Sequence, residues 1–128
     1  MYYYSVESDK KLITVKAEGQ ILLEDIFGMI DHVYKKTVEF KDLFFILDNS
    51  KAELKFSETS SAIDIFEIKN RVVQRLEGYN SIKHAVITVN ESDKGFDLFF
   101  KSIIAGIPNY EFEAFGTIEE ARIWMKLD

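Results

Sequence analysis

The stretch Leu43-Phe44-Phe45-Ile46-Leu47 is apolar throughout and is followed at once by the polar residues Asp48-Asn49-Ser50. A strand with one solvated face alternates apolar and polar residues, whereas a strand covered on both faces is apolar at every position. The stretch therefore predicts a central strand between two layers of helices. A second strand of this kind is predicted at Ala85-Val86-Ile87-Thr88-Val89, which is mostly β-branched and ends at Asn90-Glu91-Ser92-Asp93.

Around these two strands the pattern predicts an alternation of strands and helices. An antiparallel hairpin is predicted at the start of the chain, with strands at Tyr2 to Glu7 and Leu12 to Glu18 and with Gly19 at its end. Alternating residues predict a more exposed strand at Tyr110 to Phe115. Apolar residues at three- and four-residue spacing predict helices over Leu22 to Val38, from the N-cap Ser57 to Gly78, from Lys94 or Gly95 to Ala105, and from the capping box at Thr117 to about Lys126.

The resulting order is β-β-α-β-α-β-α-β-α over residues 1–128, which indicates a single α/β domain. Helices between strands imply right-handed crossovers, so we expect a mostly parallel five-stranded sheet with an antiparallel N-terminal strand and helices packed on the sheet. Lys51 to Phe56 is the one connection long enough to form an irregular loop.

Composition excludes several classes of protein. Sixteen basic and twenty-two acidic residues give a net charge of −6, which disfavours nucleic acid and anionic lipid as partners. Cysteine is absent, so disulfides and thiolate metal sites are excluded. The N-terminus lacks the pattern of a leader peptide and no run of eighteen apolar residues occurs, so we expect a cytoplasmic protein without a membrane span.

No arrangement of residues typical of catalysis is present. The chain has two histidines, His32 and His84, and both are interpreted as solvated or structural residues. The six glycines form no phosphate-binding motif. We therefore predict no catalytic residue, no metal and no cofactor.

Polar side chains follow both central strands, where ligands of open α/β sheets bind. Asp48 and Asn49 follow the first strand, and Asn90 and Asp93 follow the second. These four residues are the predicted ligand or partner site. Asp48 with Glu91 or Asp93 could hold Mg²⁺, but a turn at Asp48 and a helix cap at Ser92 or Asp93 are the favoured interpretation.

The third predicted helix carries more apolar surface than one sheet face needs. Its stripe consists of Phe96, Phe99, Phe100, Ile103 and Ile104, and Leu98 points partly away from that stripe. Core packing is the favoured interpretation of these residues. Phe96, Phe99 and Phe100 are also candidates for a dimer interface or for the wall of an apolar ligand pocket.

The chain resembles the anti-sigma factor antagonist (SpoIIAA-like, STAS) fold, and more closely the small bacterial STAS-like proteins that are grouped with CRAL-TRIO lipid-transfer domains. The resemblance covers nearly the whole chain. The stretches that carry it are Ile13-Thr14-Val15-Lys16-Ala17-Glu18-Gly19 before a helix, Leu43 to Asp48, and Phe112 to Leu127 with its Thr-Ile-Glu-Glu-Ala-Arg-Ile-Trp.

Phosphorylatable STAS proteins begin their second helix with an Asp-Ser-Ser-Gly type motif that accepts phosphate from a partner kinase. Here the region reads Phe56-Ser57-Glu58-Thr59-Ser60-Ser61, which keeps serines but lacks the Asp and Gly. Ser57 and Ser60 are therefore candidate phosphorylation sites, and capping of the helix is the alternative role.

The resemblance and the missing catalytic groups lead first to a non-enzymatic STAS-like interaction or regulatory module that contacts a protein partner or a second copy of itself. Eleven phenylalanines and the lipid-transfer side of the resemblance lead to the alternative, a binding domain for a hydrophobic small molecule or lipid. A hydrolase or phosphotransferase that uses Asp48 and Asp93 is the third hypothesis.

Overall fold

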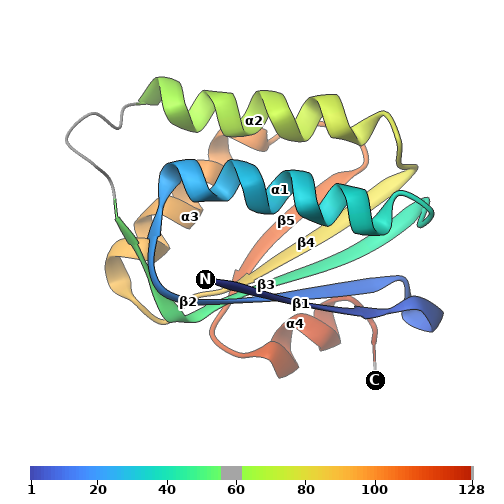
Figure 1. The fold of residues 1–128 in the computed structure, drawn as a ribbon, viewed down its shortest axis with the longest axis horizontal. Coiled ribbons are helices and arrows are strands. Elements are labelled where there is room, and N and C mark those ends of the chain that lie inside the picture. The colour runs from blue at the N-terminus through green and yellow to red at the C-terminus, as the bar shows by residue number, and fades with distance from the viewer. Residues whose placement is uncertain (56–61, 128) are drawn as a thin grey trace.

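The computed structural model describes residues 1–55 and 62–127, with the side chains of residues 23 and 62–65 left undescribed. In this part of the chain strands and helices alternate after an N-terminal hairpin, which confirms the predicted order. The elements are β1 (Tyr2–Glu7), a 3-10 turn (Ser8–Lys10), β2 (Leu12–Leu22), α1 (Leu23–Thr37), β3 (Asp42–Lys55), α2 (Ala62–Leu76), β4 (Ser81–Ile87), α3 (Glu91–Ile104), β5 (Tyr110–Phe115) and α4 (Ile118–Trp124) (Figure 1).

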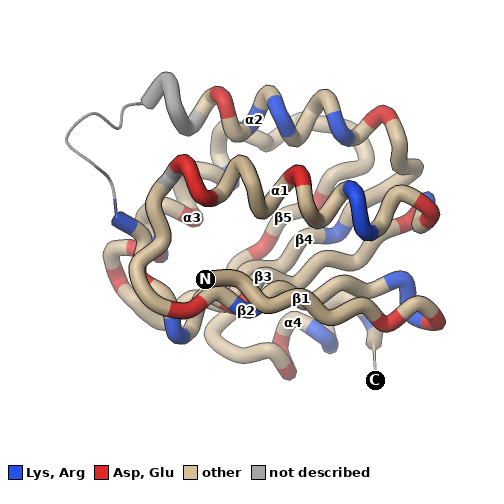
Figure 2. The backbone as a smooth tube through the Cα atoms, in the orientation of Figure 1, with Lys and Arg blue, Asp and Glu red and all other residues tan. Residues whose placement is uncertain are grey.

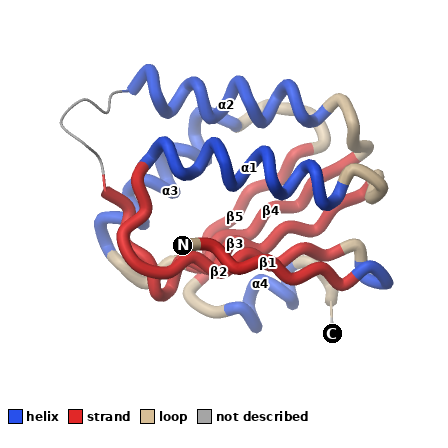
Figure 3. Tube along the Cα trace, viewed as in Figure 1, coloured by secondary structure: helices blue, strands red, loops and turns tan. Residues whose placement is uncertain are grey.

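All five strands form one sheet in the order β1-β2-β3-β4-β5. β1 pairs antiparallel with β2, and every other neighbouring pair is parallel, as predicted. β1 and β5 are consequently the two edge strands. Figure 3 shows the strands as one twisted layer with helices on either side.

The sheet lies between two unequal helical layers. α1, α2 and α3 cover one face, and the short α4 packs beneath the other (Figure 1). β3 meets both layers, since Phe45 belongs to the core under the three helices and Ile46 to the core beside α4. Alternate side chains of a strand point to opposite faces, so an unbroken apolar run is what this central strand needs.

β3 is longer than predicted, because Asp48-Asn49-Ser50 does not end it. In the pairing with β2, Lys16 lies opposite Asp48 and Glu18 opposite Lys51, so β3 advances three residues while β2 advances two. The extra residue makes a bulge, and the Asp48 carboxylate accepts a hydrogen bond from the Ser50 N–H at 3.0 Å. The turn predicted at Asp48 was therefore wrong.

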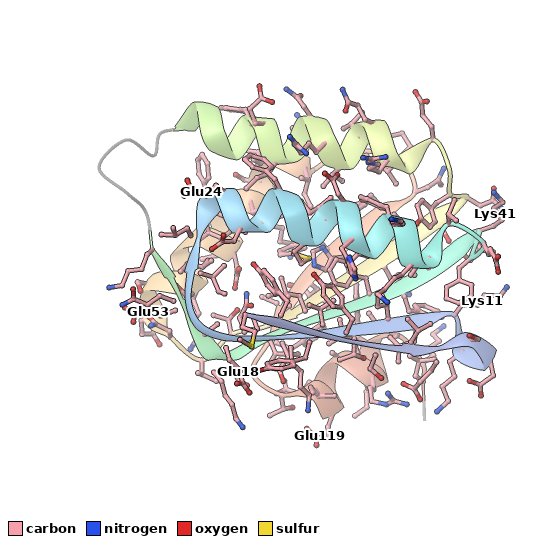
Figure 4. All side chains as sticks on the ribbon, viewed as in Figure 1. Lys11, Glu18, Glu24, Lys41, Glu53 and Glu119 are labelled. Atoms are coloured by element: carbon pink, nitrogen blue, oxygen red, sulfur yellow. The ribbon has the colours of Figure 1, made fainter. Side chains whose placement is uncertain are left out.

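Beyond the bulge, β2 and β3 continue as a pair. Lys51 to Lys55, predicted as loop, pairs with Glu18 to Leu22, so this part of the loop prediction was wrong. Gly19 does not end β2 either; it adopts a positive φ of 82° inside the strand, a conformation that glycine adopts without steric cost. Figure 4 labels Glu53 at this end of the sheet and Lys11 and Lys41 at the opposite end, where β2 and β3 begin.

Two further boundaries differ from the prediction. β4 starts at Ser81 and so includes His84. α3 starts at Glu91, and its cap is Asn90, whose side-chain oxygen accepts from the Ser92 N–H at 2.9 Å. The predicted cap at Ser92 or Asp93 was wrong by two or three residues. Ser57, the predicted N-cap of the second helix, lies outside the described residues.

α4 begins as predicted. The Thr117 hydroxyl accepts a hydrogen bond from the Glu120 N–H at 3.2 Å and donates one to the Glu120 carboxylate at 3.1 Å. Ala121 and Met125 face the second core. The predicted start and the Thr117 cap are confirmed, but the Glu120 carboxylate bonds to the Thr117 hydroxyl instead of the Thr117 N–H, so only half of the predicted capping box forms. The helix ends at Trp124 rather than near Lys126.

On α1 the acidic residues Glu24 and Asp25 lie in the first turn and the basic residues Lys35 and Lys36 in the last, an arrangement that the helix macrodipole favours (Figure 2). Among the described residues, none of the helices has the length and apolar character needed to cross a membrane.

Candidate functional site

A narrow cavity lies between the sheet and the layer formed by α1, α2 and α3. Its volume is about 60 Å³. Aromatic and aliphatic side chains from the sheet and all three helices line it, and the aromatic ones are Tyr2, Tyr34, Phe45, Phe96, Phe100, Tyr110 and Phe112. Three polar side chains, Asn49, His84 and Asp97, lie among them.

His84 stands in the middle of β4, opposite Phe45 on β3 and Phe112 on β5. Its ring stacks on Phe45 with centroids 4.2 Å apart and meets Phe112 edge-on at 5.0 Å. The residue is only 8 % exposed, so the prediction that it is solvated was wrong. Burial lowers the pKa of His84 from 6.5 to about 3, which leaves the imidazole neutral at pH 7.

The tautomer of His84 is assigned by counting the hydrogen bonds that each choice satisfies. The Tyr110 hydroxyl lies 2.6 Å from His84 Nδ1. Burial raises the pKa of Tyr110 well above its ordinary value, so the phenol keeps its proton. With a proton on Nδ1, both the hydroxyl proton and Nε2 would lack a partner among the described residues, so we assign the ring proton to Nε2 and let the hydroxyl donate to Nδ1.

His84 Nε2 is buried and has no hydrogen-bond partner among the described residues. A buried N–H without an acceptor costs about 1–3 kcal/mol. Native interiors seldom contain such a group, so an orphaned donor on the wall of a cavity indicates a site for an acceptor.

Two buried carboxylates, Asp93 and Asp97, lie about one turn apart on α3. Asp97 is 5 % exposed and accepts a hydrogen bond from the Thr88 hydroxyl at 2.6 Å. Burial raises the pKa of Asp97 from 3.8 to about 6, and the charge of nearby Asp93 adds to the shift. Burial also raises the pKa of Asp93, whose carboxylate accepts from the Leu54 N–H at 3.5 Å.

The structure separates some of the residues predicted to form one site. Asp48 comes two residues after Ile46, and both pair regularly with β4, so the two side chains point to the same face of the sheet, the α4 side. Asn49 lines the cavity under the three helices, and Asp93, in the first turn of α3, accepts from the N–H of Leu54, which lines the same cavity. Asp48 and Asp93 therefore lie on opposite faces, and the described residues hold no group of three or more metal-ligating side chains.

The other predicted site residues have different surroundings. Phe96 and Phe100 stack with centroids 6.3 Å apart and line the cavity. Phe99 is 41 % exposed, and Asn90 caps α3. Ser57 and Ser60 lie outside the described residues, so their phosphorylation stays a prediction.

A second hollow, of about 370 Å³, is an open groove along β5 and α3. Lys94, Leu98 and Lys101 lie on its α3 side at intervals of four and three, which places them on one face of that helix. Leu98 is 71 % exposed in this groove. The flanking lysines form exposed ion pairs, Lys94 with Glu91 at 3.0 Å and Lys101 with Glu113 at 2.8 Å.

Sequence reasoning missed His84, Asp97 and the α3 lysines as site residues. The alternation of Ile82, His84 and Val86 with polar Ser81 and Lys83 was a usable signal for a strand that begins earlier and turns His84 inward. Asp97 has a weaker signal, a carboxylate within the apolar stripe of a helix.

Comparisons with known proteins give structural matches only. No family model matches the sequence, and no curated protein does. An uncharacterised protein of the DUF3478 family from Shewanella loihica PV-4, described as having a SpoIIAA-like fold, matches with a TM-score of 0.60 and 16% identity over 97% of this chain and 91% of that one. This chain has the SpoIIAA-like fold.

A second solved structure agrees with this assignment. The Bacillus cell fate determinant SpoIIAA in its phosphorylated form matches with a TM-score of 0.52 and 12% identity, over 98% of this chain and 99% of that one. Within the SpoIIAA-like fold described here, the three-helix face holds the cavity, and the β5 edge holds the groove.

Proposed function

We propose that this chain is a non-enzymatic STAS-like interaction module that binds an extended segment of a partner protein along the free edge of β5. The likeness to SpoIIAA over nearly the whole of both chains supports the module. The observation that carries the binding mode is the groove that runs beside an edge strand and exposes Leu98.

Among the described residues, no strand pairs with β5 on its outer side. The carbonyls of Asn109 and Phe115 accept from β4. In a parallel ladder alternate residues face the neighbouring strand, so the N–H and C=O groups of Tyr110, Phe112 and Ala114 face away from β4. An added strand pairs with such groups, and this is a common way for a domain to bind an extended peptide.

α3 supplies the side wall for the added strand. The exposed Leu98 side chain stands between Lys94 and Lys101, so a peptide in the groove buries one of its apolar side chains against Leu98. Exposed ion pairs contribute about 0–1 kcal/mol, so the lysines can exchange Glu91 and Glu113 for carboxylates of the partner at little cost. The partner segment is thus an extended peptide with an apolar residue at the position that faces Leu98.

A peptide-display selection against the purified chain tests this proposal. Selected peptides are measured by fluorescence anisotropy against Leu98→Asp, Ala114→Pro and, as a matched surface control on α4, Ile123→Ser. Proline at Ala114 removes an outward N–H and no bond to β4. We expect the first two variants to weaken binding about tenfold or more, and the control, 75 % exposed on the other face, to leave it unchanged.

Amide hydrogen exchange of the wild-type chain supplies a readout that does not depend on any variant. The bound peptide should slow exchange at Tyr110, Phe112 and Ala114, while Glu111 and Glu113 change little because they already pair with β4. Peptides that bind Leu98→Asp and Ala114→Pro as well as wild type, or that protect another face, would refute the proposed binding mode. A dimer that forms through β5 would assign the edge to a second copy instead.

A further inference from the structure

We infer that the cavity beneath α1, α2 and α3 is a binding site for a small, uncharged molecule of about four non-hydrogen atoms whose single oxygen accepts a hydrogen bond from His84 Nε2. This site is separate from the β5 groove, and neither proposal depends on the other. The partnerless donor and the cavity that it lines carry the inference.

The donor specifies one end of the ligand. Tyr110 holds Nδ1, so the Nε2–H is directed by a fixed ring that stacks on Phe45. A carbonyl or hydroxyl oxygen within reach of Nε2 would satisfy the donor. It would also recover the free energy that the orphaned group costs in the empty protein.

The charge of the lining selects against an ionised ligand. Neither Lys nor Arg is among the described residues that line the cavity. His84 is neutral, and the carboxylate of Asp97 stands in the same wall, so a ligand carboxylate would be buried without a counter-charge. An uncharged ketone, ester or alcohol avoids this cost.

The volume of the cavity limits the size of the ligand. A volume of about 60 Å³ has room for about four to six water-sized groups, at about 10–15 Å³ each. The expected ligand therefore has the size of the smallest ketones.

Nuclear magnetic resonance titration of the wild-type chain with three probes tests the inference. The probes are acetone, isobutene, which has the same planar shape without the oxygen, and acetate, which has the charge. We expect saturable shifts of the cavity-lining methyl groups of Ile30, Val33 and Val86, with the ketone binding about tenfold more tightly than isobutene and acetate binding most weakly at pH 7. The ketone should also shift the His84 Nε2–H resonance.

His84→Phe is the matched variant, because it keeps a flat ring between Phe45 and Phe112 and removes the donor. It should bind the ketone and isobutene equally. Should this variant fold poorly, the nitrogen shifts of His84 in the wild type still decide the point, since the inference requires the proton on Nε2. A proton on Nδ1, equal affinity of the wild type for the ketone and isobutene, or no saturable shift with any probe would each overturn the inference.

Discussion

At the scale of single residues, His84 and Asp97 line the same cavity, and burial shifts their pKa values in opposite directions. His84 ionises near pH 6.5 when unfolded and near 3 when folded, so between these values the unfolded chain holds the extra proton. Its contribution to stability is present above about pH 6.5 and is lost as the pH falls. Asp97 has its pKa raised from 3.8 to about 6, so there the folded chain holds the extra proton and stability falls as the pH rises.

These opposite signs predict that the two effects nearly cancel in the wild type between about pH 4 and 6. Relative to wild type, Asp97→Asn should gain stability as the pH rises through this window, and His84→Phe should lose it, each by about 1.4 kcal/mol per pH unit. Urea unfolding at a series of pH values measures both slopes. Parallel profiles for the wild type and both variants would mean that neither side chain is buried as described.

Asn90 illustrates how one side chain can have a structural or a binding role. Its oxygen caps α3 through the Ser92 N–H, so Asn90→Ala should cost about 1 kcal/mol of unfolding free energy. Asn90→Asp keeps an acceptor at the N-cap and should restore most of that loss. Thermal or urea unfolding measures the unfolding free energy of both variants. If the alanine variant is as stable as the wild type, the cap contributes nothing to stability, and a role of Asn90 in binding becomes the better explanation.

At the scale of elements, α4 is the helix that covers the second face of the sheet, and it does so with few side chains. Ala121 is fully buried against a core that contains Leu12, Ile46 and Ala85. A small residue here allows the short helix to approach the strands closely. The fit depends on size, because a core packed to native density does not absorb added methylene groups without strain.

We therefore expect Ala121→Phe to destabilise the chain by about 1–3 kcal/mol through overpacking. Ile123→Phe is the matched control, since it places the same ring on the exposed side of the same helix and should change stability by less than about 0.5 kcal/mol. Urea unfolding followed by the fluorescence of Trp124 compares them. An Ala121→Phe variant as stable as its control would show that α4 packs more loosely than described.

At the scale of the whole molecule, the cavity and the groove share a wall. Phe112 and Asp97 line both hollows, one on β5 and the other on α3. The same two elements also frame the proposed peptide site, so a ligand under α3 and a peptide beside it would touch opposite sides of one packed layer. The peptide can be titrated in the presence of the ketone, and the ketone in the presence of the peptide, to measure whether one changes the affinity for the other.

The sequence by itself determined the order of elements and the inward face of each amphipathic helix, because both depend on local periodicity. Leu43 to Leu47 predicted a strand covered on both faces, and the placement of Phe45 and Ile46 in separate cores confirms it. Thr117 and Glu120 likewise predicted the start of α4, and the hydrogen bond from the Glu120 N–H to the Thr117 hydroxyl confirms it.

Only the tertiary structure decided which polar residues meet. Asp48-Asn49-Ser50 has the composition of a turn, and it becomes a bulge because β2 continues alongside it and offers backbone partners. His84 was interpreted as solvated or structural because the strand was predicted to begin one residue after it. The strand begins at Ser81, and Phe45 and Phe112, distant in the chain, bury the imidazole, so only the structural part of that interpretation remains. The orphaned nitrogen and the open edge of β5 are products of strand order, which no local window of sequence contains.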